Sequence, residues 1–183
     1  MQTIIYIRKE SGLVVITMKI AIAGKMASGK STAAQYLKEL NPEFETFSFA
    51  SKVKQIATDL FGMTSKDRTL LTSIGKKMRE IDSDVWANYT LKETHSRKYA
   101  VIDDLRHFNE YRILKEHGWK IIKLNISPEL QLERLSQIST PKQLKDHLNN
   151  MNDVSEQEIV NSSNEYFDLV INVNNDSVQE KIK

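Results

Sequence analysis

Residues 20–32 constrain the fold of this chain more than any other stretch. Four apolar residues, Ile20 to Ala23, lead into Gly24–Ser31, which matches the pattern G-x-x-x-x-G-K-[ST] at every fixed position. Residues 33–40 follow; they are rich in helix formers, and their apolar side chains are spaced for one buried face. The matching segment therefore lies between a buried strand and a helix, where a phosphate-binding loop belongs. We call Gly24–Ser31 the phosphate loop.

The phosphate loop has the chemistry of an anion site. Backbone N–H groups around its glycines turn inward to form a concave nest, and the N-terminus of the following helix adds partial positive charge. Lys30 supplies a full charge for the β- and γ-phosphates, and the Ser31 hydroxyl is a ligand for Mg²⁺. The sequence therefore predicts a nucleoside triphosphate site.

Composition excludes several classes of protein. The 183 residues suffice for one domain with a substantial core, and we treat 1–183 as a single domain. The net charge of +2 gives no reason to expect a nucleic-acid partner, and the absence of cysteine excludes disulfides, thiolate catalysis and Cys-type zinc sites. No apolar run reaches the roughly 18 residues of a membrane-spanning helix, and charged residues interrupt the apolar N-terminal stretch. We expect no membrane partner and a cytoplasmic location.

Apolar runs alternate with helix-spaced segments along the rest of the chain. Besides the strand before the phosphate loop, strands are expected at 44–49, 99–102, 119–126 and 168–173, and helices at 107–117, 128–138, from 155, and after 176. This alternation predicts an α/β fold with a doubly wound, five-stranded parallel sheet. Ahead of it, residues 1–17 form an N-terminal extension whose two apolar runs predict a hairpin. We hypothesise that this extension is dispensable.

Residues 51–97, which we call the insertion, contain no convincing strand. Three helices are expected there, at 51–61, 66–79 and 84–94, and the whole segment is too long for an ordinary crossover between strands. The insertion is rich in positive charge, carrying Lys52, Lys54, Arg68, Lys76, Lys77 and Arg79 among others. Most of these side chains are expected on solvated helix faces, but two or three suffice to bind a second anionic ligand.

Acidic side chains follow the strand at 99–102. Asp103 and Asp104 fall at the carboxyl end of a parallel strand, where open α/β sheets present catalytic groups. A carboxylate there can hold Mg²⁺ through water or accept a substrate proton, or it can merely cap the next helix. Arg106 either clamps a phosphoryl group or pairs with the two acids. Farther along, residues 134–154 are a candidate lid, although the polar part, 139–154, is equally consistent with a simple loop.

These features together resemble the nucleoside monophosphate kinases, most closely the deoxynucleoside monophosphate kinases of phages and large DNA viruses. The resemblance spans about residues 18–175. It rests first on the phosphate loop and on Phe49-Ala50-Ser51-Lys52-Val53-Lys54 followed by Leu60-Phe61-Gly62. In the rest of the insertion it rests on Arg68 to Leu71, Gly75, Arg79, Asp84 and Trp86. Later in the chain it rests on Asp104-Leu105-Arg106 with Asn109-Glu110, and on Ser155-Glu156 ahead of the last strand.

The resemblance implies a P-loop fold, with ATP-dependent phosphoryl transfer to a (deoxy)nucleoside monophosphate. ATP and Mg²⁺ are then the cofactors, and a small phosphorylated acceptor is the partner. The protein would act as a monomer or homodimer, in the host cytoplasm if it is viral. The insertion would bind the acceptor, and residues 134–154 would form the lid.

The same resemblance implies roles for individual residues. The triphosphate would contact Gly24, Lys25, Met26, Ala27, Ser28, Gly29, Lys30, Ser31 and Thr32. Catalysis would depend on Lys30, Asp104, Arg106 and Arg134, and Mg²⁺ on Ser31 and Asp104. The acceptor would contact Lys54, Arg68, Arg79 and Trp86, and adenine the loop at Asn172 and Asn174.

Two other interpretations stay open at this stage. Animal-type phosphomevalonate kinase is similar around the phosphate loop and the Asp-x-Arg strand end, and dephospho-coenzyme A kinase shares the architecture. A stacking Trp86 favours a base over an isoprenoid, whereas a Trp86 in the core gives no preference. A regulatory ATPase would instead need a nucleotide-sensing loop and a partner surface, and the sequence has neither in recognisable form.

Overall fold

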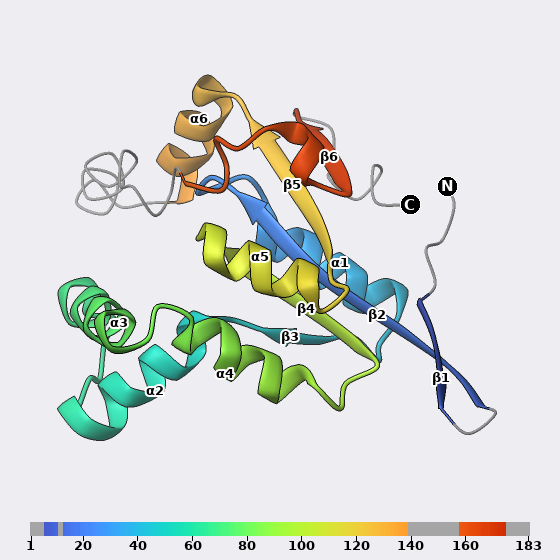
Figure 1. Cartoon of the computed structure of the whole chain (residues 1–183). Helices are drawn as coiled ribbons and strands as arrows, with labels where there is room; N and C mark the ends of the chain where they lie inside the picture. The colour runs from blue at the N-terminus through green and yellow to red at the C-terminus, as the bar shows by residue number, and fades with distance from the viewer. Residues whose placement is uncertain (1–5, 11–12, 139–157, 175–183) are drawn as a thin grey trace.

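The computed structural model describes residues 6–10, 13–138 and 158–174, and its strands form one sheet (Figure 1). The strands are β1 Tyr6–Glu10, β2 Leu13–Gly24, β3 Glu45–Phe47, β4 Tyr99–Leu105, β5 Lys120–Ile126 and β6 Leu169–Val173. The helices are α1 Lys30–Leu40, α2 Ala50–Phe61, α3 Arg68–Ile81, α4 Val85–Thr94, α5 Phe108–Glu116 and α6 Pro128–Ile138, with a 3₁₀ turn, η1, at Asn164–Tyr166. Within this part of the chain, no helix has the length and apolarity needed to cross a bilayer.

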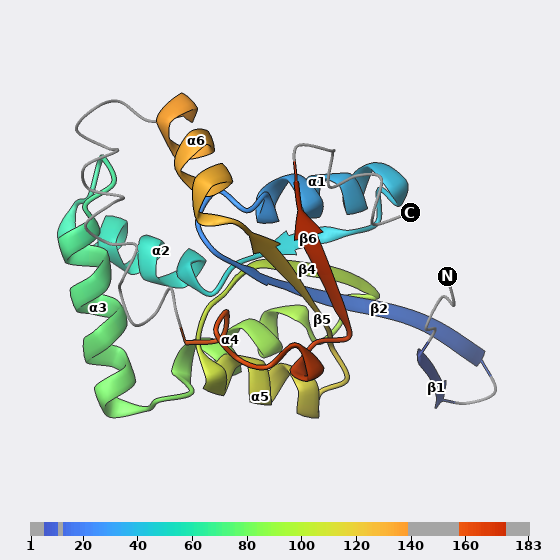
Figure 2. The ribbon, with the colours of Figure 1, turned by 90° about the horizontal axis from the view of Figure 1, so that it is seen from above.

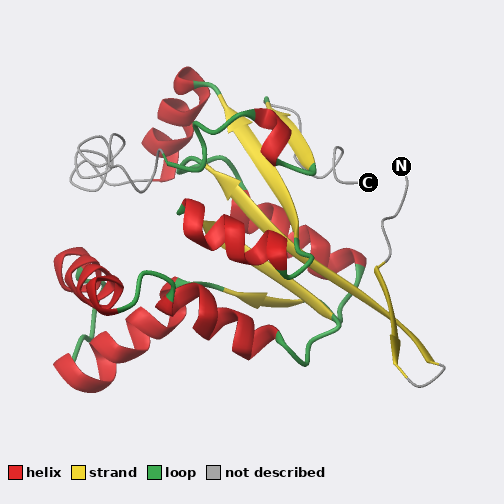
Figure 3. Ribbon diagram, in the orientation of Figure 1, coloured by secondary structure: helices red, strands yellow, loops and turns green. Residues whose placement is uncertain are grey.

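Five strands form a parallel sheet in the order β3-β4-β2-β5-β6, which confirms the predicted fold class. The central strand β2 contributes Ala21, Ile22 and Ala23, all fully buried, because helices cover both faces of the sheet. Helix α1 packs on one face, and α4 and α5 pack on the other (Figures 2 and 3).

The sheet brings the end of β4 next to the start of the phosphate loop. Ala23 in β2 pairs with Leu105 in β4, so the residues that follow both strands emerge side by side. On its other side β2 pairs with β5, whose neighbour along the chain is the start of α6. The order of the strands thus reverses at β2, and parallel sheets bind ligands at the carboxyl ends of strands beside such a reversal.

Helices α2, α3 and α4 occupy the insertion, and α2 and α3 lie away from the sheet on the side opposite α6 (Figure 1). Strand β3 ends at Phe47, two residues earlier than predicted, because α2 already begins at Ala50. The helix expected from residue 155 is not seen in its described part, where residues 158–162 form turns. Residues 139–154 of the candidate lid and the helix expected after residue 176 lie outside the described residues.

The N-terminal hairpin projects beyond the parallel sheet (Figure 1). Strand β1 pairs antiparallel with the first five residues of β2, with Tyr6 opposite Thr17, whereas parallel pairing starts at Met18 opposite Tyr99. We therefore expect a chain that begins at Met18 to keep its fold and its nucleotide binding. Its midpoint of thermal unfolding should lie within about 5 °C of the full chain, and loss of folding or activity would contradict the proposed dispensability.

Candidate active site

The phosphate loop doubles back tightly between β2 and α1. A Cβ atom at Gly24 would lie 2.5 Å from Ser28 Oγ and 2.9 Å from the carbonyl oxygen of Leu124, so only glycine fits. At the other end of the loop, Ala27 and Gly29 adopt left-handed backbone conformations, with φ of 61° and 94°. These turns direct the loop around the N-terminus of α1, the arrangement expected of an anion nest.

Two polar side chains of α1 reach from its first turn to neighbouring elements. Lys30 Nζ donates to the carbonyl oxygens of Gly24 at 2.7 Å and Lys25 at 2.9 Å, which holds the ammonium group over the phosphate loop. Ser31 Oγ donates to Asp103 Oδ2 at 2.6 Å. A positive charge and a hydroxyl–carboxylate pair thus lie on the two sides of the helix start.

Helix α6 covers the phosphate loop from the β6 side. Buried Gln131 donates through Nε2 to the carbonyl oxygen of Met26 at 3.0 Å. Arg134 donates through Nη1 to the carbonyl oxygen of Ala27 at 3.3 Å and through Nη2 to that of Asn174 at 3.2 Å. The structure therefore places Arg134 and Asn174, both predicted site residues, beside the phosphate loop.

Asn172, the other residue predicted to contact adenine, lies two positions earlier in β6. Its side-chain oxygen accepts from Asn125 Nδ2 on the neighbouring strand β5 at 3.3 Å. Asn172 is exposed at the same carboxyl edge of the sheet. Both asparagines thus sit on the β6 flank of the phosphate loop, away from the insertion.

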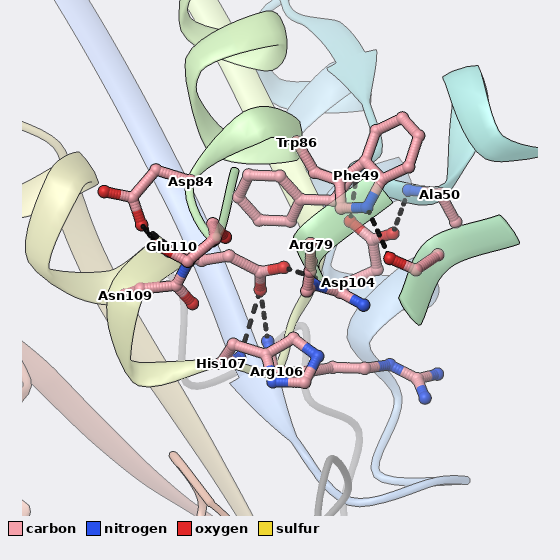
Figure 4. Close-up of polar contacts among 12 residues, drawn as sticks. Phe49, Ala50, Arg79, Asp84, Trp86, Asp104, Arg106, His107, Asn109 and Glu110 are labelled. Atoms are coloured by element: carbon pink, nitrogen blue, oxygen red, sulfur yellow. Dashed lines mark hydrogen bonds and ion pairs between the residues drawn. The ribbon is translucent and has the colours of Figure 1, made fainter. Parts of the chain in front are cut away.

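The two acids at the end of β4 have different neighbours. Asp103 faces Ser31, as described above, whereas Asp104 points to the start of α2 (Figure 4). Asp104 accepts hydrogen bonds from Ser48 Oγ at 2.6 Å and from the backbone N–H groups of Phe49 and Ala50 at 3.0 and 3.1 Å. Adjacent residues of a strand point to opposite faces, which explains the division. Asp104 was the acid predicted to hold Mg²⁺ together with Ser31, but the carboxylate that lies beside Ser31 is that of Asp103.

A cleft with a volume of about 590 Å³ opens between the phosphate loop, the end of β4 and the insertion. Seven cationic side chains line it: Lys30, Lys54, Lys66, Arg68, Lys76, Arg79 and Arg106. The carboxylates that line it are Asp103, Asp104 and Glu110. Positive charge therefore predominates, which favours an anionic ligand.

Lys66 is a cleft residue that sequence analysis missed. It precedes Asp67, which caps α3 by accepting from the N–H of Leu70, so Lys66 belongs to the loop before α3 and not to the helix. Burial lowers the pKa of Lys66, and the charges of Arg68, Lys54 and Arg106 lower it further. Its depressed pKa indicates that cations from three segments converge here.

Other lysines of the insertion lie outside the cleft. Lys52 Nζ donates to Gln55 at 3.0 Å and lies 5.3 Å from the ring centre of Tyr89. Lys77 pairs with Glu80 at 2.8 Å, and both side chains are exposed. These two lysines therefore belong to solvated helix faces.

Trp86, which was predicted to contact the acceptor, does not line the cleft. Its side chain is 2% exposed and packs in the core between the insertion and the sheet. Its indole Nε1 donates to the carbonyl oxygen of Gly75 at 3.2 Å, joining α4 to α3 (Figure 4). The motif residues Asp84 and Asn109 also have a structural role, because Asn109 Nδ2 donates a hydrogen bond to Asp84 at 2.9 Å.

The Ser31–Asp103 pair has the donor chemistry that Mg²⁺ prefers, a hydroxyl and a carboxylate oxygen. No group of three or more His, Cys, Asp or Glu side chains in the described ranges could hold a metal ion by itself. A Mg²⁺ ion at this position would therefore depend on nucleotide phosphates and water for its remaining ligands, as is usual in nucleotide-binding sites.

Comparison of the sequence with protein families identifies a match. A family model described as an AAA domain matches residues 20–161. The match begins in β2 and includes the phosphate loop, the insertion and the end of β4. No curated protein gives a significant match to the chain.

Solved structures share the fold over nearly the whole chain. A shikimate kinase from Acinetobacter baumannii, solved in complex with shikimate, has a TM-score of 0.52 and 22% identity, covering 91% of this chain and 90% of that one. An uncharacterized protein from Eubacterium ventriosum has a TM-score of 0.55 and 16% identity, over 91% and 96%. TT1252 from Thermus thermophilus has a TM-score of 0.54 and 15% identity, over 90% and 92%. At these identities the likeness establishes a P-loop kinase-like fold.

Proposed function

Because the chain belongs to the family of AAA domains and has a P-loop kinase-like fold, we propose that it transfers the γ-phosphoryl group of ATP to a small phosphorylated molecule. Within this class we propose a (deoxy)nucleoside monophosphate as the acceptor, giving the diphosphate and ADP. The reaction takes ATP and Mg²⁺ as cofactors.

One observation carries the proposal: the distribution of positive charge around the cleft. Lys30 and Arg106 lie at the phosphate loop and the end of β4, whereas the other five cations come from the insertion. The phosphate loop already supplies backbone donors and the Lys30 ammonium group for a triphosphate. A second phosphate-bearing ligand accounts for the cations of the insertion, since a site built for phosphate favours lysine and bidentate arginine.

Phosphoryl transfer requires neutralised charge and aligned oxygens, with little covalent chemistry by the protein. We assign charge neutralisation to Lys30, Arg106 and Arg134, and contact with the triphosphate to residues 24–32. Ser31 and Asp103 would hold Mg²⁺, which supplies charge stabilisation when bound. Lys54, Lys66, Arg68 and Arg79 would hold the acceptor phosphate, and Asn172 and Asn174 would lie near adenine.

The core position of Trp86 removes one reason for preferring a nucleobase over other organic groups. A phosphomevalonate-like acceptor is therefore the second candidate, because it too would present a phosphate to the cations of the insertion. The shikimate kinase of similar fold was solved in complex with shikimate, which supports a small-molecule acceptor in general.

The proposal is tested by measuring ADP release with a panel of deoxynucleoside and ribonucleoside monophosphates, phosphomevalonate and dephospho-coenzyme A. We expect ADP release to depend on one of the monophosphates. Release that depends on phosphomevalonate would establish the second candidate instead. Rapid ATP hydrolysis without any acceptor would favour a regulatory ATPase and contradict the proposal.

Replacement of Arg79 by alanine should weaken acceptor binding. Arg79 lines the cleft from the end of α3. We expect Arg79→Ala to raise the acceptor KM about tenfold and to change the ATP KM by less than about twofold. The matched control is Lys77→Ala, two positions earlier in α3, because Lys77 is exposed and pairs with Glu80. Equal effects on both KM values would remove Arg79 from the acceptor site.

A further inference from the structure

Glu110 is an unusual member of the cleft lining because it is buried. The residue is 3% exposed, and among the charged residues of the described ranges only Lys123 is also buried. The pKa of Glu110 is raised, chiefly by burial, and His107 with two backbone N–H groups offsets only part of that rise. A carboxylate is retained in such a position only where its oxygens have good partners.

The two oxygens of Glu110 have partners in different elements. Oε2 accepts from the backbone N–H groups of Arg106 and His107, each at 3.1 Å, and so fixes the turn between β4 and α5. Oε1 forms an ion pair at 3.6 Å with Nη2 of Arg79, which belongs to α3 of the insertion. Figure 4 shows Glu110 between Arg79 on one side and the backbone of Arg106 and His107 on the other.

The remaining carboxylates of the cleft are engaged elsewhere. Asp103 accepts from Ser31, and Asp104 accepts from Ser48 and the start of α2. Arg79 and Arg106 are brought into one cleft from two elements, and like charges repel each other. Glu110 pairs with the Arg79 guanidinium and accepts from the backbone N–H of Arg106, so its negative charge beside Arg79 offsets part of this repulsion.

We infer that Glu110 is a positioning residue that holds Arg79 and Arg106 as two arms of one phosphate clamp. This inference rests on the proposed function, in which the insertion binds the acceptor phosphate. We assign Glu110 no contact with either ligand, because both of its oxygens have protein partners. Its two sets of contacts join α3 to the end of β4, and so keep the two arginines in the lining of one cleft.

The substitution Glu110→Gln distinguishes a positioning role of Glu110 from a purely structural role. In Glu110→Gln the amide oxygen still accepts from Arg106 N and His107 N, so the turn after β4 keeps its hydrogen bonds. The amide NH₂ group then faces Arg79 without a charge, so the ion pair is lost. If Glu110 only stabilises the turn, glutamine substitutes for it fully; if it positions Arg79, phosphate binding weakens.

The test uses the full chain with Mg²⁺ and a non-hydrolysable ATP analogue bound, titrated with inorganic phosphate as the probe of the second site. We expect Glu110→Gln to raise the phosphate Kd about fivefold and Arg79→Ala to raise it about tenfold. The variant that combines Glu110→Gln with Arg79→Ala should raise the phosphate Kd no more than Arg79→Ala alone. Thermal unfolding confirms that each variant is folded. Glu116→Gln is the matched control, since Glu116 is an exposed acid at the far end of α5.

An unchanged phosphate Kd in folded Glu110→Gln, additive effects in the double variant, or no phosphate binding by the unmodified chain would each overturn the inference. The panel assay separates this result from the proposed function. If the chain transfers phosphate to an acceptor but phosphate binding does not depend on Glu110, the clamp is refuted and the proposed function stands. Phosphate binding that depends on Glu110, without transfer to any acceptor, would refute the proposed function and keep the clamp.

Discussion

Lys30→Ala is expected to lower the rate of phosphoryl transfer about 10³-fold while the chain stays folded. Lys30 Nζ is held over the phosphate loop by the carbonyl oxygens of Gly24 and Lys25, so its charge is already placed where the β- and γ-phosphates would lie. Both carbonyl groups can take water in its place, which limits the effect on stability. ADP release under saturating ATP and acceptor measures the rate, and thermal unfolding monitors the fold.

The matched control for this substitution is Lys38→Ala. Lys38 is exposed near the end of the same helix, about two turns from the phosphate loop, and does not line the cleft. Its removal should change the rate by less than about twofold. Turnover by folded Lys30→Ala at the level of the control would contradict the assignment of the phosphate loop as the ATP site.

Asp103→Asn is expected to lower kcat about 10²-fold without loss of stability, because it removes the charge that accompanies Ser31 at the proposed Mg²⁺ position. The asparagine oxygen still accepts the Ser31 hydroxyl, so the local structure is retained. The measurement is kcat as a function of Mg²⁺ concentration, and part of the loss should be recovered at high Mg²⁺.

Asp104→Asn gives the contrasting result. Asp104 accepts three hydrogen bonds at the start of α2, so its replacement should lower the free energy of unfolding by about 1 kcal/mol. We expect its effect on kcat to stay below about fivefold. Urea unfolding measures the stability of the Asp103→Asn and Asp104→Asn variants, and ADP release measures their kcat. A larger loss of kcat in Asp104→Asn than in Asp103→Asn would restore the original assignment to Asp104.

Much of the fold was predictable because its determinants are local. Strands β2, β4 and β5 appear as near-continuous apolar runs, as expected of strands buried on both faces, and the edge strand β6 also has an apolar run. The phosphate loop was predictable for a stronger reason, since Gly24 and Gly29 meet backbone requirements that other residues meet poorly. The end of β3 was less predictable, because Asp104, distant in the sequence, starts α2 by accepting from Phe49 and Ala50.

The site was harder to predict where it depends on contacts between distant elements. Either acid at the end of β4 could face the phosphate loop, and only the register of β4 on β2 directs Asp103 to Ser31. The sequence around Trp86 does not distinguish a tryptophan that stacks on a ligand from one that packs in the core. Lys66 seemed to start a helix, and the partnership of Glu110 with Arg79 joins residues 31 positions apart in the sequence.

The central claim is that the γ-phosphoryl group of ATP passes to a phosphate held by the insertion. Phosphorus NMR of the reaction mixture follows that group directly. We expect two pairs of mutually coupled phosphorus signals to grow as the γ-phosphate signal of ATP declines, one from ADP and a second from a P–O–P linkage on the acceptor. Growth of inorganic phosphate alone besides ADP, or of an uncoupled phosphomonoester signal, would contradict the claim.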